Sequence, residues 1–166
     1  SCDGFDIHPY APTQPAEYSY EIALKSQEMF EKYGYGDKPV IYSEIGYTSN
    51  GITDEQQRNY VIELSAMVND LTDVIVWHTD QELENDTPAE IKFGWLRSWT
   101  PEKVAPKEPY SPKPVFIAAA NWNRLMTGAT DSHEVVAADS DIKMWQLTDK
   151  LGQKVTLAWK KTAGEK

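Results

Sequence analysis

Apolar and polar residues divide the first half of the chain into short apolar runs separated by longer amphipathic stretches. The apolar runs, which predict strands, lie at 4–8, at the run that ends with Ser43, and at 74–77. The amphipathic stretches between them predict helices over 16–33 and 53–71. Strand, helix, strand, helix, strand is the order of βαβ units with parallel strands. Because the strands are apolar throughout, we expect both faces of their sheet to be covered.

The predicted helices carry apolar residues at helical spacing, which indicates the face that each one buries. In the first helix this stripe consists of Tyr18, Ile22, Met29, Phe30 and Tyr33. In the second helix it consists of Val61, Leu64, Val68 and Leu71. We expect both stripes to pack against the sheet.

Several residues mark where helices begin and end. Gly34 follows the first helix, and residues 53–56, Thr-Asp-Glu-Gln, form a capping box that opens the second. A third helix is predicted over 114–127, with Gly128 behind it. These signals support the alternation of strands and helices up to about residue 130.

The last part of the chain has a different pattern. Residues 142–147 alternate between apolar and polar, residues 149–153 predict a turn, and residues 155–159 alternate again. This is typical of an antiparallel hairpin with one face in water. We therefore divide the chain into an α/β part, 1–130, and a β part, 131–166.

The strand that ends at Ser43 is followed at once by a carboxylate, Glu44. A charge at the end of a buried strand is costly if it stays unpaired. In parallel α/β barrels, the catalytic groups lie at the C-terminal ends of the strands. Glu44 is therefore the first candidate for a catalytic residue.

Four segments carry a resemblance to a known family. Residues 38–47 read Lys-Pro-Val-Ile-Tyr-Ser-Glu-Ile-Gly-Tyr, residues 4–10 end in His-Pro-Tyr, and residues 73–78 end in Trp-His. Residues 113–120 begin with Lys-Pro and end with three alanines. They resemble the seventh, sixth and eighth strands and the last helix of the retaining glycoside hydrolases of clan A, which are built on a (β/α)8 barrel.

The resemblance implies a partial (β/α)8 barrel, strands six to eight with their helices, followed by a hairpin from an appended β-sandwich. A whole barrel needs about 250 residues, whereas this chain has 166. The family's acid/base Glu ends the fourth strand, which no segment here matches. We therefore expect the C-terminal part of a longer enzyme that is inactive as an isolated fragment. Its expected partners are a companion N-terminal fragment or copies of itself.

By this resemblance, Glu44 is the nucleophile that attacks the anomeric carbon and forms a glycosyl-enzyme ester. Tyr10 and His8 would lie beside Glu44 if their strands are neighbours. A phenol that donates to the carboxylate would keep it ionised and oriented. His8 would orient the carboxylate or contact a sugar hydroxyl. The alternative is a hydrogen-bonded pair at the barrel mouth that does not touch substrate.

Further candidate residues lie at and beyond the eighth strand. An indole offers a flat apolar face to a pyranose ring, and the long segment 79–112 is typical of an active-site loop. The charged groups at 78–84 also fit a solvated charge cluster, and the tryptophans of the loop also fit loop packing. The candidates for substrate binding are Trp77, His78, Asp80, Trp95 and Trp99.

Two alternatives to a glycosidase remain open. His8, Glu44, His78 and Asp80 could converge as ligands in a metal-dependent hydrolase. No H-x-H or H-E-x-x-H spacing is present, so we assign no metal. The chain could also be a non-catalytic carbohydrate-binding fragment, or a barrel fragment that associates with itself through unpaired sheet edges.

Composition narrows the class of partner. A net charge of −10 disfavours nucleic-acid binding, and no apolar run approaches the roughly 20 residues of a membrane span. The expected partner is a carbohydrate, as glycoside, oligosaccharide or polysaccharide, with no cofactor. The single cysteine, Cys2, excludes an internal disulfide, and His133 is expected at the surface. No targeting segment fixes a location, which leaves a secreted or periplasmic one open.

Overall fold

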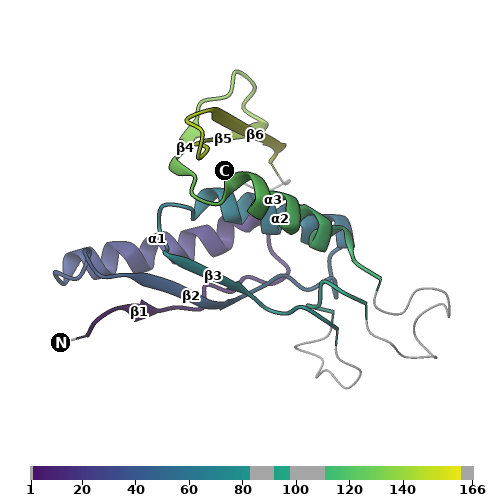
Figure 1. Ribbon diagram of the computed structural model, residues 1–166, viewed down its shortest axis with the longest axis horizontal. Coiled ribbons are helices and arrows are strands. Elements are labelled where there is room, and N and C mark those ends of the chain that lie inside the picture. Colours follow the sequence, from purple (N-terminus) through teal and green to yellow (C-terminus); the bar gives the residue numbers. More distant parts are fainter. Residues whose placement is uncertain (1, 83–91, 98–110, 162–166) are drawn as a thin grey trace.

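The computed structural model describes residues 2–82, 92–97 and 111–161. In this part of the chain, three helices lie between two three-stranded sheets (Figure 1). The helices cover one face of the first sheet, and the second sheet lies on their far side (Figure 1). Among these residues, no helix combines the length and apolarity that crossing a bilayer requires.

The first sheet is parallel, as predicted. Its strands are β1 (Phe5–Asp6), β2 (Val40–Ile45) and β3 (Val74–Trp77), in the order β1-β2-β3. Helix α1 (Ala16–Lys32) connects the first two strands, and helix α2 (Asp54–Met67) connects the second and third. The structure therefore confirms the βαβ order and the parallel pairing, with β2 in the centre.

The boundaries of the two strands around the candidate site differ from the prediction. β1 ends at Asp6 instead of residue 8, although the Ile7 N–H still donates to the Ile41 carbonyl at 3.0 Å. β2 does not end at Ser43 but continues to Ile45, and its pairing with β3 is irregular just before that residue. Glu44 thus lies within the last, irregular part of the central strand.

Helix α2 begins as predicted. The Thr53 hydroxyl accepts a hydrogen bond from the Gln56 N–H at 3.1 Å, and the Gln56 side-chain oxygen accepts one from the Thr53 N–H at 2.9 Å. The predicted face is largely confirmed, because Val61, Leu64 and Val68 are buried. The helix ends at Met67 instead of residue 71, and the chain turns there toward β3.

The prediction for the buried face of α1 is wrong. Tyr18, Met29 and Tyr33 are 51%, 50% and 66% exposed, and of the predicted stripe only Phe30 is buried. The helix instead packs through a side of small residues, which allows a close approach, and Phe30 stacks on Phe5 with ring centroids 3.9 Å apart. Its buried residues are Ala16, Ser19, Ala23 and Phe30.

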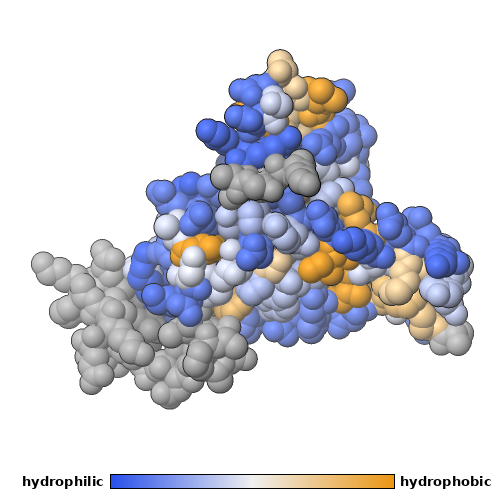
Figure 2. Space-filling view, turned by 180° about the vertical axis from the view of Figure 1, so that it is seen from behind, coloured by the Kyte–Doolittle hydropathy of each residue, from blue (hydrophilic) through white to orange (hydrophobic). Residues whose placement is uncertain are grey.

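The sheet face that turns away from the helices is also uncovered. Ile41, Val74 and Val76 are 39%, 46% and 48% exposed, and none of the labelled helices and strands lies beneath this face in the ribbon view (Figure 1). The expectation of two covered faces is therefore wrong for this chain. Seen from behind, the surface also shows hydrophobic patches among hydrophilic residues (Figure 2).

The C-terminal part contains the predicted hairpin and one strand that was missed. Helix α3 (Pro114–Met126) leads into β4 (Thr130–Val135), which pairs antiparallel with β5 (Ile142–Thr148), and β5 pairs antiparallel with β6 (Lys154–Lys160). The sequence of β4, Thr-Asp-Ser-His-Glu-Val, has almost no apolar residues, so periodicity cannot reveal it. It includes His133, whose side chain is 43% exposed, in line with the surface position expected for it.

The second sheet shares the core of the helices. Trp145 and Leu147 of β5 are buried, and the Trp145 ring meets Tyr20 of α1 edge to face at 5.4 Å. The Trp159 indole N–H donates to Glu17 of α1 at 3.1 Å. In the described residues, the α/β part and the β part are thus joined by one hydrophobic cluster.

Leu64 tests this core. We expect Leu64→Ala, at a fully buried position, to lower the free energy of unfolding by about 2–5 kcal/mol, because transfer energy is lost and a cavity remains. Leu125→Ala is the matched control, since Leu125 is 51% exposed, and should stay within about 0.5 kcal/mol of the parent. Urea unfolding followed by circular dichroism measures both. Equal losses in the two variants would contradict this placement of the core.

Candidate active site

Three strand ends bring four of the sequence-predicted residues together. The Tyr10 hydroxyl donates to Glu44 Oε1 at 3.0 Å. His8 Nδ1 lies 3.9 Å from Glu44 Oε2, and His78 Nδ1 lies 3.8 Å from Oε1. Because parallel strands end at the same edge of a sheet, the residues that follow β1 and β3 flank the carboxylate on the central strand.

Pro9 shapes the path that places Tyr10 and His8. This residue is buried, and its missing N–H ends the regular ladder along β2. The Tyr10 N–H donates to the His8 carbonyl at 2.8 Å, which closes a tight turn around the proline. The turn sends the Tyr10 and His8 side chains toward opposite oxygens of Glu44.

Glu44 is more open than its apolar strand suggests. Its side chain is 45% exposed, so the expectation of a costly desolvated charge is not met. Within the described residues, Oε1 accepts the Tyr10 hydrogen bond, whereas no group donates a hydrogen bond to Oε2. One oxygen is thus held in place, and the other stays accessible to a reacting atom.

Phe93 was not identified from the sequence, yet it supports two of the site residues. It is 5% exposed, and its ring meets the Tyr10 ring at 6.0 Å and the His78 ring at 5.3 Å, both edge to face. Gly46 permits this close packing, because a Cβ there would overlap the His78 carbonyl oxygen and lie 3.0 Å from Phe93. Phe93 belongs to a segment without periodicity. In the sequence, only Gly46, which follows β2, could have indicated that another segment packs closely against the backbone here.

Trp77 and Trp95 pack against the hydrophobic core and against each other. The Trp77 and Trp95 rings have centroids 5.9 Å apart and are tilted by 42°. Both are half-buried, and Trp95 Nε1 is a buried donor without a partner among the described residues. The structure therefore joins the predicted platform and one of the two predicted loop tryptophans, while Trp99 lies outside the described residues.

The acidic residues after β3 do not form one solvated cluster. Asp80 is exposed and accepts a hydrogen bond from the Thr79 hydroxyl at 3.2 Å. Glu82, by contrast, forms a close ion pair with Lys113, and these side chains are 15% and 2% exposed. The solvated-cluster alternative is thus wrong for Glu82, while Glu84 lies outside the described residues.

Through ion pairs with Glu82 and Asp54, Lys113 links the segment after β3 to the start of α2. Its ammonium donates to Ser49 Oγ and to the Lys92 carbonyl, each at 3.1 Å, and lies 4.0 Å from Asp54. Arg97 also pairs with Asp54 at 2.8 Å. Burial lowers the pKa of Lys113 from its usual value, although the carboxylates of Glu82 and Asp54 oppose this shift.

A second network lies at the other end of the site. The Asp6 carboxylate accepts hydrogen bonds from Ser43 Oγ at 2.8 Å and from the Ser43 N–H at 3.2 Å. Ser43 Oγ lies 3.0 Å from His8 Nε2. The side-chain hydrogen bond from Ser43 lowers the pKa of Asp6 below its usual value. Asp6 and Ser43 were not predicted as site residues. Asp6 lies two residues before His8, a spacing that places both side chains on one face of an extended strand, and this spacing could have indicated Asp6.

The geometry does not favour the metal alternative. Among the described residues, no group of three or more His, Cys, Asp or Glu side chains is suited to hold a metal ion. His8 and His78 approach Glu44 from the sides of different oxygens instead of converging on one point with Asp80.

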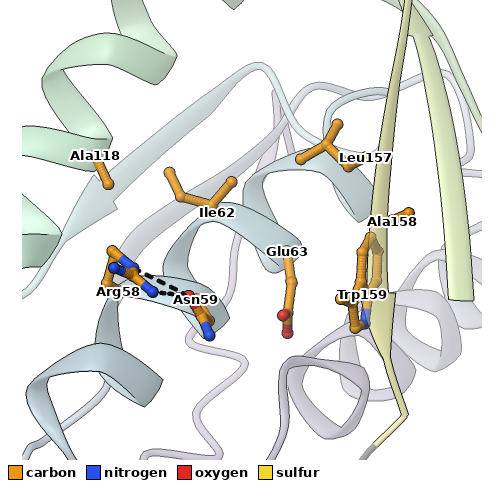
Figure 3. Close-up of a pocket in the computed structure, with 8 residues that line it drawn as sticks. All are labelled: Arg58, Asn59, Ile62, Glu63, Ala118, Leu157, Ala158 and Trp159. Atoms are coloured by element: carbon orange, nitrogen blue, oxygen red, sulfur yellow. Dashed lines mark hydrogen bonds between the residues drawn. The ribbon is translucent and has the colours of Figure 1, made fainter. Parts of the chain in front are cut away.

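A hollow of about 360 Å³ lies elsewhere, lined by α2, α3 and β6 (Figure 3). Figure 3 shows the Glu63 carboxylate and the Trp159 ring on its walls, and Arg58 hydrogen-bonded to Asn59. Because its lining comes from the helices and the second sheet, we do not assign this hollow to the Glu44 site.

The fold of the chain resembles part of a solved glycoside hydrolase structure. No protein-family model and no curated protein matches the chain in sequence. Its structure matches a family 39 glycoside hydrolase from the gut symbiont Bacteroides cellulosilyticus WH2 with a TM-score of 0.67 and 20% identity. A monomeric β-xylosidase from Caulobacter crescentus CB15 matches over 80% of this chain and 27% of its own, with a TM-score of 0.48 and 15% identity.

The first match covers 97% of this chain but only 34% of the family 39 enzyme. The chain therefore has a mixed α/β fold like that of part of a glycoside hydrolase. At this identity the likeness establishes the fold alone.

The ion pair of Lys113 and Glu82 can be tested by a double-mutant cycle. We expect Lys113→Met to lower the free energy of unfolding by about 3 kcal/mol, because it leaves the largely buried Glu82 carboxylate uncompensated. Adding Glu82→Gln should recover part of this loss, since the second variant removes the orphaned charge. Lys25→Met, at an exposed pair with Glu21, is the control and should change little. Additive effects of the two substitutions, measured by urea unfolding, would show that the pair is not coupled.

Proposed function

We propose that this chain is the C-terminal barrel part of a retaining glycoside hydrolase of clan A, with Glu44 as its nucleophile. The substrate class is a β-linked glycoside, oligosaccharide or polysaccharide. The observation that carries the proposal is the Tyr10–Glu44 hydrogen bond at the C-terminal ends of parallel strands. The fold shared with part of a family 39 glycoside hydrolase supports it.

The geometry around Glu44 suits a nucleophile. Tyr10 holds Oε1, which leaves the accessible Oε2 to attack the anomeric carbon. The C–O bond to the leaving group breaks as the ester bond to Oε2 forms, and a second carboxyl group protonates the departing oxygen. That group then takes a proton from water, which attacks the anomeric carbon and releases Glu44.

Two acidic residues of the site's networks, Asp6 and Glu82, are unsuited to be this second carboxyl group. The Ser43 hydrogen bonds lower the pKa of Asp6, so Asp6 holds no proton to donate at neutral pH. Glu82 is committed to the buried Lys113. In this proposal the acid/base residue belongs to the remaining barrel of the parent protein, and the 166 residues alone are inactive.

The uncovered surfaces of the chain fit the same proposal. The open face of the sheet, with Ile41, Val74 and Val76, would become the interior of a closed barrel. The exposed side chains of Tyr18 in α1 and of Tyr33, which follows the helix, would pack against a neighbouring helix of a companion N-terminal part. In the isolated chain the same apolar surfaces favour a second outcome, association with copies of itself.

Sugar binding is assigned to the residues around β3. Trp77 provides the platform for a pyranose ring, and Trp95 extends it. His78 and Asp80 lie at the end of the same strand and would bind sugar hydroxyls. Trp99 completes the proposed set as a further subsite residue.

Covalent trapping tests the nucleophile. We expect a mechanism-based fluoroglycoside, incubated with the parent protein or with this chain joined to its companion part, to leave a glycosyl adduct on Glu44. Peptide mass spectrometry locates the adduct, and Glu44→Gln should abolish it. Glu55→Gln, at an exposed residue of the first turn of α2, is the matched control and should leave it unchanged. An adduct on a different carboxylate, or products of inverted configuration, would overturn the assignment.

Turnover by the chain alone tests the missing acid/base residue. We expect the 166 residues to hydrolyse an aryl β-glycoside no faster than their Glu44→Gln variant. Loss of general acid catalysis alone slows such reactions by about 10²–10⁴-fold. Addition of the companion part should restore turnover, as measured by release of the aryl alcohol. Glu44-dependent turnover without the companion would show that the acid/base residue lies within this chain.

A further inference from the structure

Four polar groups form a row across the first two strands. The Asp6 carboxylate lies against Ser43 Oγ at 2.8 Å, and Ser43 Oγ lies 3.0 Å from His8 Nε2. On the far side of the imidazole ring, His8 Nδ1 lies 3.9 Å from Glu44 Oε2. The imidazole of His8 thus separates the Asp6–Ser43 pair from the proposed nucleophile.

The protons that Asp6, Ser43 and His8 carry fix the direction of the hydrogen bonds among them. Asp6 accepts both the hydroxyl and the backbone N–H of Ser43, and its pKa is lowered, so it is ionised and can only accept. A serine hydroxyl has one proton, which here goes to Asp6. Ser43 Oγ can therefore only accept from the His8 ring, which requires a proton on Nε2.

We propose that Asp6, acting through Ser43, fixes neutral His8 in the Nε2–H tautomer and thereby leaves Nδ1 as a hydrogen-bond acceptor facing Glu44. Asp6 and Ser43 are positioning residues in this arrangement. Neither of them needs to touch substrate.

The tautomer has a consequence for Glu44 Oε2. An Nδ1–H would donate toward this oxygen and occupy the lone pair that the reaction needs. With Nδ1 unprotonated, two acceptors face each other at 3.9 Å, and neither can donate a hydrogen bond to the other. A water molecule or a hydroxyl group next to both atoms can donate a hydrogen bond to Nδ1.

The chemical class of that donor rests on the proposed function. If Glu44 attacks the anomeric carbon, a sugar hydroxyl near that carbon is the donor that Nδ1 accepts. The site would then select for a hydroxyl at this position, because a sugar without one leaves a lone pair unmatched.

His133 serves as an internal reference, because its hydrogen bond requires the other tautomer, with the proton on Nδ1. His133 Nδ1 lies 2.9 Å from the Asp131 backbone carbonyl. A carbonyl oxygen only accepts, so His133 must carry its proton on Nδ1. The two histidines are therefore expected to show opposite tautomers in one sample.

Long-range ¹⁵N–¹H correlation spectra of the ¹⁵N-labelled chain test the proposal. The sequence has three histidines, and His8→Gln assigns the His8 signals by their loss. Spectra are recorded at a pH high enough that the ring shifts no longer change, so that the rings are neutral. We expect a protonated Nε2 and an unprotonated Nδ1 for His8, and the reverse for His133.

An unconstrained imidazole also favours Nε2–H in water, so the variants decide the matter. Ser43→Ala removes the acceptor for Nε2–H, and Asp6→Ala frees the Ser43 proton. Each should raise the Nδ1–H to Nε2–H ratio of His8 roughly fivefold, the change that one ordinary hydrogen bond sets. Each should also speed exchange of the His8 Nε2 proton with water. Ser26→Ala, which removes an exposed hydroxyl of α1 bonded to the Ile22 carbonyl, is the control and should change neither quantity.

Two results would overturn the proposal. One is a proton on Nδ1 of neutral His8 in the parent chain. The other is an unchanged His8 ratio and exchange rate in both variants while the His133 signals show that they are folded. If one of the two variants does not fold, the other decides the matter by the same two quantities. Because these spectra need no turnover, a failure here leaves the Glu44 trapping result untouched, and the reverse also holds.

Discussion

The central position of β2 is the constraint on which the site depends. Parallel pairing on both sides of this strand brings the ends of β1 and β3 to the same edge as Glu44. Tyr10 and Glu44 are 34 residues apart in sequence, yet their side chains form a 3.0 Å hydrogen bond. An antiparallel neighbour would have carried its C-terminal end to the opposite edge of the sheet. The site is therefore a product of chain order, with α1 and α2 as the crossovers that parallel strands require.

Sequence patterns predicted the strands β1 to β3 and the helices α1 and α2, because the apolar periodicity and the capping residues of each element are local in the sequence. The apolar run of β3 and the capping box at Thr53 both hold in the structure. The meeting of Glu44 with Tyr10 and His8 was predicted only through the resemblance to a family, since spacing along a chain says nothing about which strands become neighbours. The same resemblance placed Trp77 at the end of β3, where the ring of Trp95 joins it.

The features that the sequence did not reveal have specific causes. The stripe of α1 shows that large apolar side chains recur at helical spacing, but not whether their partner lies in this chain. Lys113 appeared only as part of a helix start, because the burial of a lysine depends on Glu82 and Asp54, which lie far away in sequence. β4 has polar residues where a strand pattern needs apolar ones, and its pairing with β5 gives it a structure that its own residues do not encode.

Under the proposed function, the uncovered surfaces and the chemistry of the site both involve the companion part of the barrel. The open face belongs to the same sheet, β1-β2-β3, whose strand ends carry Glu44 and its neighbours. A polypeptide that covered this face would bring its own strand ends to the same edge, as barrel closure requires. Under the proposed function, one partner therefore covers Ile41 and Val74 and also places the second carboxyl group opposite Glu44 Oε2. The Asp6–Ser43–His8 row is complete within this chain, so under the same proposal these three residues need no group from the partner to be positioned.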